Sequence, residues 1–183
     1  MSVINFSALK NNIIDVIKES QIKLGFSSNE ANLNYPLDSL NNLLGINYTV
    51  DEMENALNEF TDHIKNELGS INVANDQNNF CITIPVEGVK YINEKIKAHP
   101  FLTEFIGLLK SNCNVTIDDI LRVFNKYSDN VECIEVNNDE FNYLVYFKDG
   151  VPDNFRYCID IDLGHATYHR LTPSDYESLG YGY

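Results

Sequence analysis

Hydrophobic residues recur at helical spacing through the first two thirds of the chain. Between residues 6 and 24, Phe6, Leu9, Ile13 and Ile17 recur every three or four positions, which is typical of the buried stripe of an amphipathic helix. Residues 50–68 repeat this pattern behind a Thr49–Glu52 capping box. Similar runs predict helices between residues 36 and 45 and around 89–96, 101–109 and 117–124.

The pattern changes to strand-like alternation at two places. Residues 70–74 and 80–84 are rich in β-forming side chains and flank the turn-forming stretch NDQNN, so they predict a hairpin. After residue 128, four β-rich runs separated by turn signals predict an antiparallel meander. These runs are Val131–Val136, Phe141–Phe147, Phe155–Asp162 and His165–Leu171.

These elements together predict an α+β protein. N-terminal helices are followed by a C-terminal antiparallel β-meander of about four strands, with an extra hairpin near residues 70–84. No stretch is rich enough in Pro, Gly or Ser to be a linker, so we expect a single α+β domain over residues 1–183. Within it, residues 1–128 are mainly helical and residues 129–183 form the sheet.

Strand alternation sorts the meander into two faces. If Leu163-Gly164 is a two-residue turn, Asp162 lies opposite His165, and Cys158 opposite His169. Pairing Phe147 with Phe155 then places Tyr146 beside Arg156 and Asn142 beside Asp160. The predicted apolar face, on which helices pack, contains Phe141, Tyr143, Val145, Tyr157, Ile159, Ile161 and Tyr168. The other, polar face is the candidate ligand or partner site: it contains Asn142, Tyr146, Arg156, Asp160, Asp162, His165, Thr167 and His169.

Three interpretations of the polar face stay open. It can be an ordinary solvated sheet face, with Asp162 and His165 as a cross-strand ion pair. It can be a metal site, in which Asp160, Asp162 and His165 hold a divalent transition metal; His169 lies roughly 13 Å along the strand, too far for the same ion. Cys158 and His169 also suit a nucleophile and its base, although an inert sheet cysteine is the more common case.

Charge narrows the kinds of partner. With 13 basic and 27 acidic residues, the net charge is −14, which disfavours binding to nucleic acid or to an anionic membrane. Residues 129–183 hold 11 acidic and 3 basic residues, and therefore −8 of that charge. The leading hypothesis is a non-enzymatic protein-interaction module that binds a basic partner, with Tyr146 as anchor and Asp160 and Asp162 as charged contacts.

Two alternatives compete with this hypothesis. One is a metal- or ligand-dependent enzyme on the polar face, in which Arg156 orients an anionic group. The other is a homodimeric structural component. No nucleotide-binding loop or nucleophile elbow is present in the sequence, so apart from the metal no cofactor is expected, and the balance favours a protein that is not an enzyme.

The sequence also carries signals about the compartment. No basic segment followed by an apolar one begins the chain, no apolar run approaches the ~20 residues that span a bilayer, and the four cysteines form no C-x-x-C pair. We therefore expect a cytoplasmic protein with reduced thiols.

The stretch YCIDIDLGHATYHRLTPSDY, residues 157–176, carries a family resemblance. Together with DEFNYLVYF before it and IPVEGVKYI upstream, it resembles an uncharacterised bacterial family known only as a domain of unknown function. The resemblance runs over nearly the whole chain. It implies a small stand-alone bacterial cytoplasmic protein, and it supplies no activity and no site residue.

Overall fold

The computed structural model describes residues 4–111, 114–136 and 138–180. The chain divides into two compact units, residues 1–98 and 99–183, which are considered one at a time. Each unit contains helices and one antiparallel sheet, so the predicted α+β class is confirmed. The single domain over residues 1–183 stays a prediction, because compactness of the two units does not measure whether they fold cooperatively.

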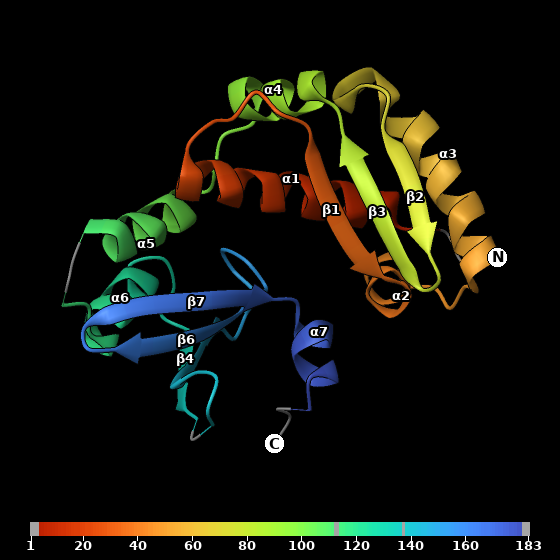
Figure 1. The fold of residues 1–183 in the computed structure, drawn as a ribbon. Coiled ribbons are helices and arrows are strands. Elements are labelled where there is room, and N and C mark those ends of the chain that lie inside the picture. The colour runs from red at the N-terminus through yellow and green to blue at the C-terminus, as the bar shows by residue number, and fades with distance from the viewer. Residues whose placement is uncertain (1–3, 112–113, 137, 181–183) are drawn as a thin grey trace. The chain divides into compact units, whose positions relative to one another are not determined.

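Unit 1 is built around a three-stranded sheet, here called sheet A, with strand order β1-β3-β2 (Figure 1). The predicted hairpin is present as β2 and β3, and the helices match the hydrophobic periodicity. The elements are α1 Phe6–Leu24, β1 Ala31–Pro36, α2 Leu37–Leu44, α3 Val50–Leu68, β2 Asn72–Asp76, β3 Asn79–Ile84 and α4 Val86–Lys95.

Strand β1 was not predicted. It pairs antiparallel with β3, from Ala31 opposite Ile84 to Pro36 opposite Asn79. Its apolar residues Ala31, Leu33 and Tyr35 do alternate with exposed ones, but the residues between them are asparagines, which have low β-propensity. Pro36, expected to open a helix, instead ends this strand in an extended conformation and directly precedes α2.

One face of sheet A forms the core of unit 1. Phe80, Ile82 and Ile84 on β3 are fully buried and belong to a cluster with apolar residues of α1, α2, α3 and α4. The opposite face consists of small or polar residues, including Asn34, Cys81 and Thr83. The helical layer therefore covers a single face of this sheet.

Unit 2 contains the predicted four-stranded meander, sheet B, in the order β4-β5-β6-β7. The register also matches the prediction: Tyr143 lies opposite Ile159, and Asp162 opposite His165. The elements are α5 Pro100–Ser111, α6 Ile117–Asn125, β4 Val131–Glu135, β5 Tyr143–Phe147, β6 Arg156–Asp162, β7 His165–Leu171 and α7 Pro173–Ser178.

The core of unit 2 is an aromatic cluster around Tyr157. This ring contacts Phe101 and Phe105 on α5, Phe124 on α6 and Tyr168 on β7, with centroid distances of 5.2–6.1 Å. Most of these pairs meet edge to face, the arrangement that the aromatic quadrupole favours. We call this the core face of sheet B.

The Tyr157 hydroxyl is satisfied at the edge of this core. It donates a hydrogen bond of 2.6 Å to Asp153 Oδ2, and the Arg170 guanidinium pairs with the same oxygen at 3.2 Å. Arg170 also lies over the Phe155 ring, 3.8 Å from its centroid. Because the Arg170 side chain is only 4% exposed, its charge depends on partners within the protein.

Substitutions at two helical glycines should have opposite effects on stability. A Cβ on Gly88 would overlap the Leu68 carbonyl oxygen and lie 2.8 Å from Ile84 Cγ2, so Gly88→Ala should cost about 1–3 kcal/mol of unfolding free energy. Gly107 has nothing within 4 Å of its Cβ position, so Gly107→Ala should add about 0.5–1 kcal/mol. Chemical denaturation measures both, and equal effects would contradict the close packing at Gly88.

The Asp153 cluster can be tested in the same way. Tyr157→Phe removes one hydrogen bond and should cost roughly 1 kcal/mol. Asp153→Ala removes a carboxylate from a buried guanidinium and should cost on the order of 3 kcal/mol. If denaturation shows the two variants to be equally stable, the ion pair does not hold this corner of unit 2.

Candidate functional site

The predicted site lies on the face of sheet B opposite the aromatic core, here called the second face. Strand register arranges it in rows across β5, β6 and β7. From one end of the sheet to the other, the rows are Asp162 with His165; Asp160 with Thr167; Leu144 with Cys158 and His169; and Tyr146 with Arg156 and Leu171. The two rows nearest the β6–β7 turn are therefore polar, and the two further rows mix apolar residues with His169 and Arg156.

The far end of the second face is covered, which the sequence did not predict. Tyr176 of α7 packs with Phe141, Leu144 and Cys158 in a small second core. Phe141 was predicted on the core face and this was wrong: it precedes β5, so the strand alternation does not reach it. Part of this face is therefore covered, whereas Asp162, His165 and Thr167 near the β6–β7 turn are exposed.

Asn142 has a structural role. It lies just before β5, where its side-chain Oδ1 accepts a hydrogen bond of 2.6 Å from the Ile161 backbone N–H. Its own N–H donates to the Ile159 carbonyl at 2.9 Å. Asn142 thus extends the β5–β6 ladder past the end of the strand, and it also lines an open cleft of about 590 Å³ beside the start of α6.

Tyr146 and Arg156 lie side by side as predicted, and they bind each other. The guanidinium carbon is 4.0 Å from the centre of the Tyr146 ring, within range of a cation–π interaction. Tyr146 is half-buried, so it is less available as an exposed anchor than the sequence suggested. One terminal nitrogen of Arg156, Nη1, is buried and has no hydrogen-bond partner among the described residues.

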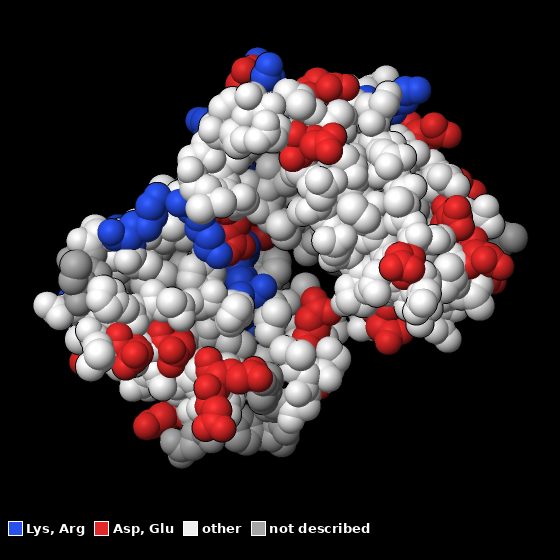
Figure 2. All heavy atoms as spheres, viewed as in Figure 1, with Lys and Arg blue, Asp and Glu red and all other residues white. Residues whose placement is uncertain are grey.

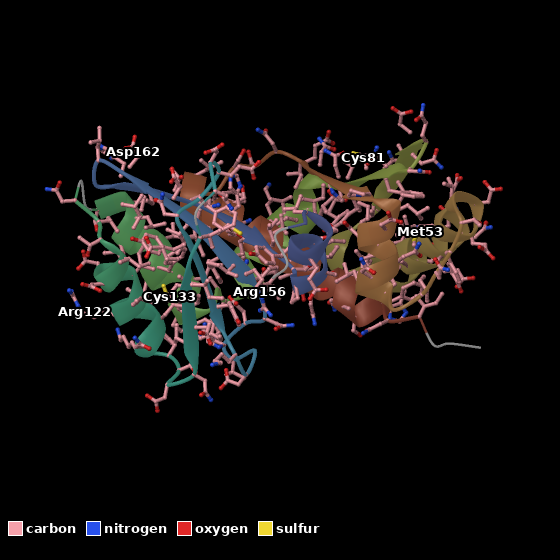
Figure 3. The ribbon with its side chains drawn as sticks, turned by 90° about the horizontal axis from the view of Figure 1, so that it is seen from below. Met53, Cys81, Arg122, Cys133, Arg156 and Asp162 are labelled. Carbon is pink, nitrogen blue, oxygen red and sulfur yellow. The ribbon has the colours of Figure 1, made fainter. Side chains whose placement is uncertain are left out.

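Asp160 and Asp162 occupy successive outward positions at the other end of β6. Asp160 is half-buried and Asp162 exposed, and Figure 3 shows Asp162 at one end of the sheet with Arg156 well away from it. Asp162 lies opposite His165, but in the described part of the chain no ion pair joins the two side chains, so the cross-strand ion pair considered for a solvated face is not formed. Neither carboxylate has a hydrogen-bond or ion-pair partner among those residues.

A cleft of about 440 Å³ opens on the second face between these polar rows and α7. Apolar side chains predominate in its lining, among them Leu179, which is 54% exposed. Glu140 and the exposed His169 contribute the polar groups. The residues are Glu140, Phe141, Cys158, His169, Leu171 and Leu179. Of these, the sequence pointed to His169 as a residue of the polar face and to Cys158 as a candidate nucleophile.

The structure does not assemble a metal site. Among residues 4–111, 114–136 and 138–180, no three His, Cys, Asp or Glu side chains are grouped so that they could hold an ion. Asp160, Asp162 and His165, the predicted ligands, are all within these ranges. The metal hypothesis therefore gains no support from this arrangement.

Cys158 and His169 lie opposite each other, but the environment of the thiol does not favour a nucleophile. Cys158 is only 2% exposed, and burial, together with the nearby Glu140 charge, raises the pKa of its thiol to about 11. Since the thiolate is the reactive form, this cysteine stays protonated at neutral pH. It contributes packing to the wall of the cleft.

These features define the class of the protein: an α+β chain with two antiparallel sheets and a cleft on an incompletely covered sheet face. More particularly, the chain belongs to the bacterial family described as "Domain of unknown function, E. rectale Gene description (DUF3877)", whose model matches residues 6–180. No curated protein and no solved structure matches the chain. In the described part of the chain, no helix is both long and apolar enough to cross a bilayer.

The environment of Cys158 predicts low reactivity in the folded protein. With a thiol pKa of about 11, roughly one molecule in a thousand carries the thiolate at pH 8. In the folded protein, iodoacetamide should modify Cys158 at least tenfold more slowly than the half-buried Cys81. In the protein unfolded by urea, Cys158 should react at the rate of a free thiol. Peptide mass spectrometry over time measures both, and equal native rates would show that the cleft wall opens readily.

Proposed function

We propose that the chain is a non-enzymatic protein-interaction module that binds a basic segment of a partner protein at the open end of the second face. The observation that carries the proposal is the pair Asp160 and Asp162, two outward carboxylates without a charged partner among the described residues. A carboxylate gains most from an added cation where no internal cation already compensates it.

The neighbouring cleft supports a more specific partner. Its apolar wall, with Leu171 and the exposed Leu179, is suited to one apolar side chain, and Glu140 adds a carboxylate to its lining. A segment with an apolar anchor flanked by Lys or Arg would place the anchor in the cleft and the cations beside the carboxylates. Arg156 does not oppose such a ligand strongly, because it lies four residues before Asp160 on β6, roughly 13 Å along the strand and beyond the Debye length.

Overall charge supports the same kind of partner. At −14, the chain would attract a basic protein over distances comparable to the Debye length and speed its association. The described cysteines Cys81, Cys133 and Cys158 are free thiols, which fits a reducing compartment. We therefore include a cytoplasmic location in the proposal.

A peptide array with a matched control pair tests the proposal. Arrayed peptides that contain one apolar residue between Lys or Arg residues should bind, and Asp160→Asn/Asp162→Asn should weaken binding by about fivefold to thirtyfold, at about 0.5–1 kcal/mol per exposed charge. Glu59→Gln/Asp62→Asn makes the same change in net charge at exposed positions of α3 and should have little effect.

Two outcomes would overturn the proposal. One is an array on which no basic peptide binds more tightly than the same peptide with its Lys and Arg residues replaced by uncharged ones. The other is an equal loss of binding in the two double variants, which would show that net charge alone attracts these peptides. We expect peptide binding to weaken as the salt concentration is raised. The loss should be larger for the wild type than for Asp160→Asn/Asp162→Asn, because the variant lacks the two charges that salt screens.

A further inference from the structure

Strand β1 leaves a row of backbone groups without partners at the edge of sheet A. The β1–β3 register, continued by one residue, places Leu37 opposite Asn78. The Leu37 N–H donates to the Asn78 carbonyl at 2.7 Å, so this is a hydrogen-bonded pair, and Tyr35 and Leu33 belong to the next bonded pairs along β1. Because bonded and non-bonded pairs alternate in an antiparallel ladder, Asn32 and Asn34 turn their N–H and C=O groups away from β3. Among the described residues no backbone group bonds them.

A groove lies beside the first half of this edge, at Ala31, Asn32 and Leu33. It has a volume of about 380 Å³ and lies between α1, the start of β1 and Val89 of α4. Val16 and Ile17 of α1 and Leu33 of β1 give it apolar walls, and Ser20, Gln21 and Asn32 give it neutral polar ones. Figure 1 shows β1 as the outer strand of sheet A on the side away from β2.

The groove is poor in charge for so acidic a chain. Glu30 is the one charged residue in its described lining, and Figure 2 shows that most of the surface over β1 and β3 is uncharged. Val16 is 37% exposed, and Phe26, in the loop that follows α1, is 47% exposed. Depletion of charge and exposed apolar side chains are typical of the centre of a protein interface.

Gln21 adds a polar group that needs a donor. Its side-chain Nε2 donates to the Val89 carbonyl at 3.3 Å, and this bond fixes the orientation of the amide. Its Oε1 is buried and has no hydrogen-bond partner among the described residues. An unsatisfied buried acceptor is unfavourable, so the groove wall is more complete when a donor reaches it.

We propose that this groove binds an extended, uncharged segment of a partner protein, which adds to β1 as an outer strand of sheet A. The outward groups of Asn32 and Asn34 repeat every two residues, a spacing that an extended polypeptide backbone matches. Alternate side chains of the segment would then enter the groove between Val16 and Leu33. Pro36 has no N–H and ends the strand, so the added strand is short.

This site is independent of the proposed basic-segment site. Its residues all belong to unit 1, and its ligand is recognised by backbone hydrogen bonds and apolar contacts instead of by charge. A second copy of the chain, paired β1 to β1, would use the same edge. Light scattering distinguishes these two ligands of the β1 edge. If the ligand is a segment of a partner protein, as proposed, the free protein does not dimerise through β1; if it is a second copy, the protein dimerises there.

Three variants test the site. Asn34→Pro removes an outward N–H without breaking the β1–β3 ladder, a position at which edge strands tolerate proline. Val16→Asp places a charge on the groove wall. Asn11→Asp, at an exposed position of α1, makes a similar change away from the groove and is the control.

A phage library of random uncharged heptapeptides is the probe. We expect peptides enriched on wild type to bind Asn11→Asp equally well, to bind Asn34→Pro and Val16→Asp at least tenfold more weakly, and to slow amide hydrogen exchange of Asn32 and Asn34 tenfold or more. Asp160→Asn/Asp162→Asn should leave this binding unchanged. Failure to enrich any peptide, peptides that bind all variants alike, or a free protein that dimerises through β1 would each overturn the proposal.

Discussion

The need to satisfy the Tyr157 hydroxyl inside an aromatic core organises unit 2. The ring is completely buried, and burial holds the pKa of its phenol well above the usual value, so the group stays a neutral donor. Asp153 accepts that hydrogen bond and pairs with the buried Arg170. Tyr157 thus joins the loop before β6, the end of β7 and the two helices on the core face. Because these elements cover the core face, the second face is the one on which a ligand can bind.

The meander and its register were predictable because two local signals agree. The Leu163-Gly164 turn aligns β6 with β7, and the alternation of Tyr157, Ile159 and Ile161 fixes which side chains are buried. Prediction failed where such signals are weak or end. Phe141 lies before β5, where alternation no longer applies, and in β1 asparagines between Ala31, Leu33 and Tyr35 conceal an otherwise regular strand.

The candidate site was predictable as a set of residues but not as a surface. Strand pairing identifies which positions lie opposite one another, and it does so correctly for Asp162 and His165. It does not determine whether the two side chains form an ion pair. Fixing two exposed side chains loses rotamer entropy, and the free energy gained from a surface ion pair is of similar size. The cleft depends on a cluster that joins Phe141 and Leu144 to Tyr176, residues that are distant in the sequence, and no local sequence pattern predicts that cluster.

Each proposed binding surface is a part of a sheet that the neighbouring helix does not cover. Helix α7 has six residues and extends about 9 Å, whereas the seven residues of β7 extend about 23 Å. It can therefore cover Cys158 and Leu171 but cannot reach Asp160 or Asp162. In unit 1, α1 packs against the face of sheet A and leaves the edge of β1 uncovered. The first surface exposes side-chain charge and the second exposes backbone, so each selects its ligand by a different interaction, and salt weakens binding at the first far more than at the second.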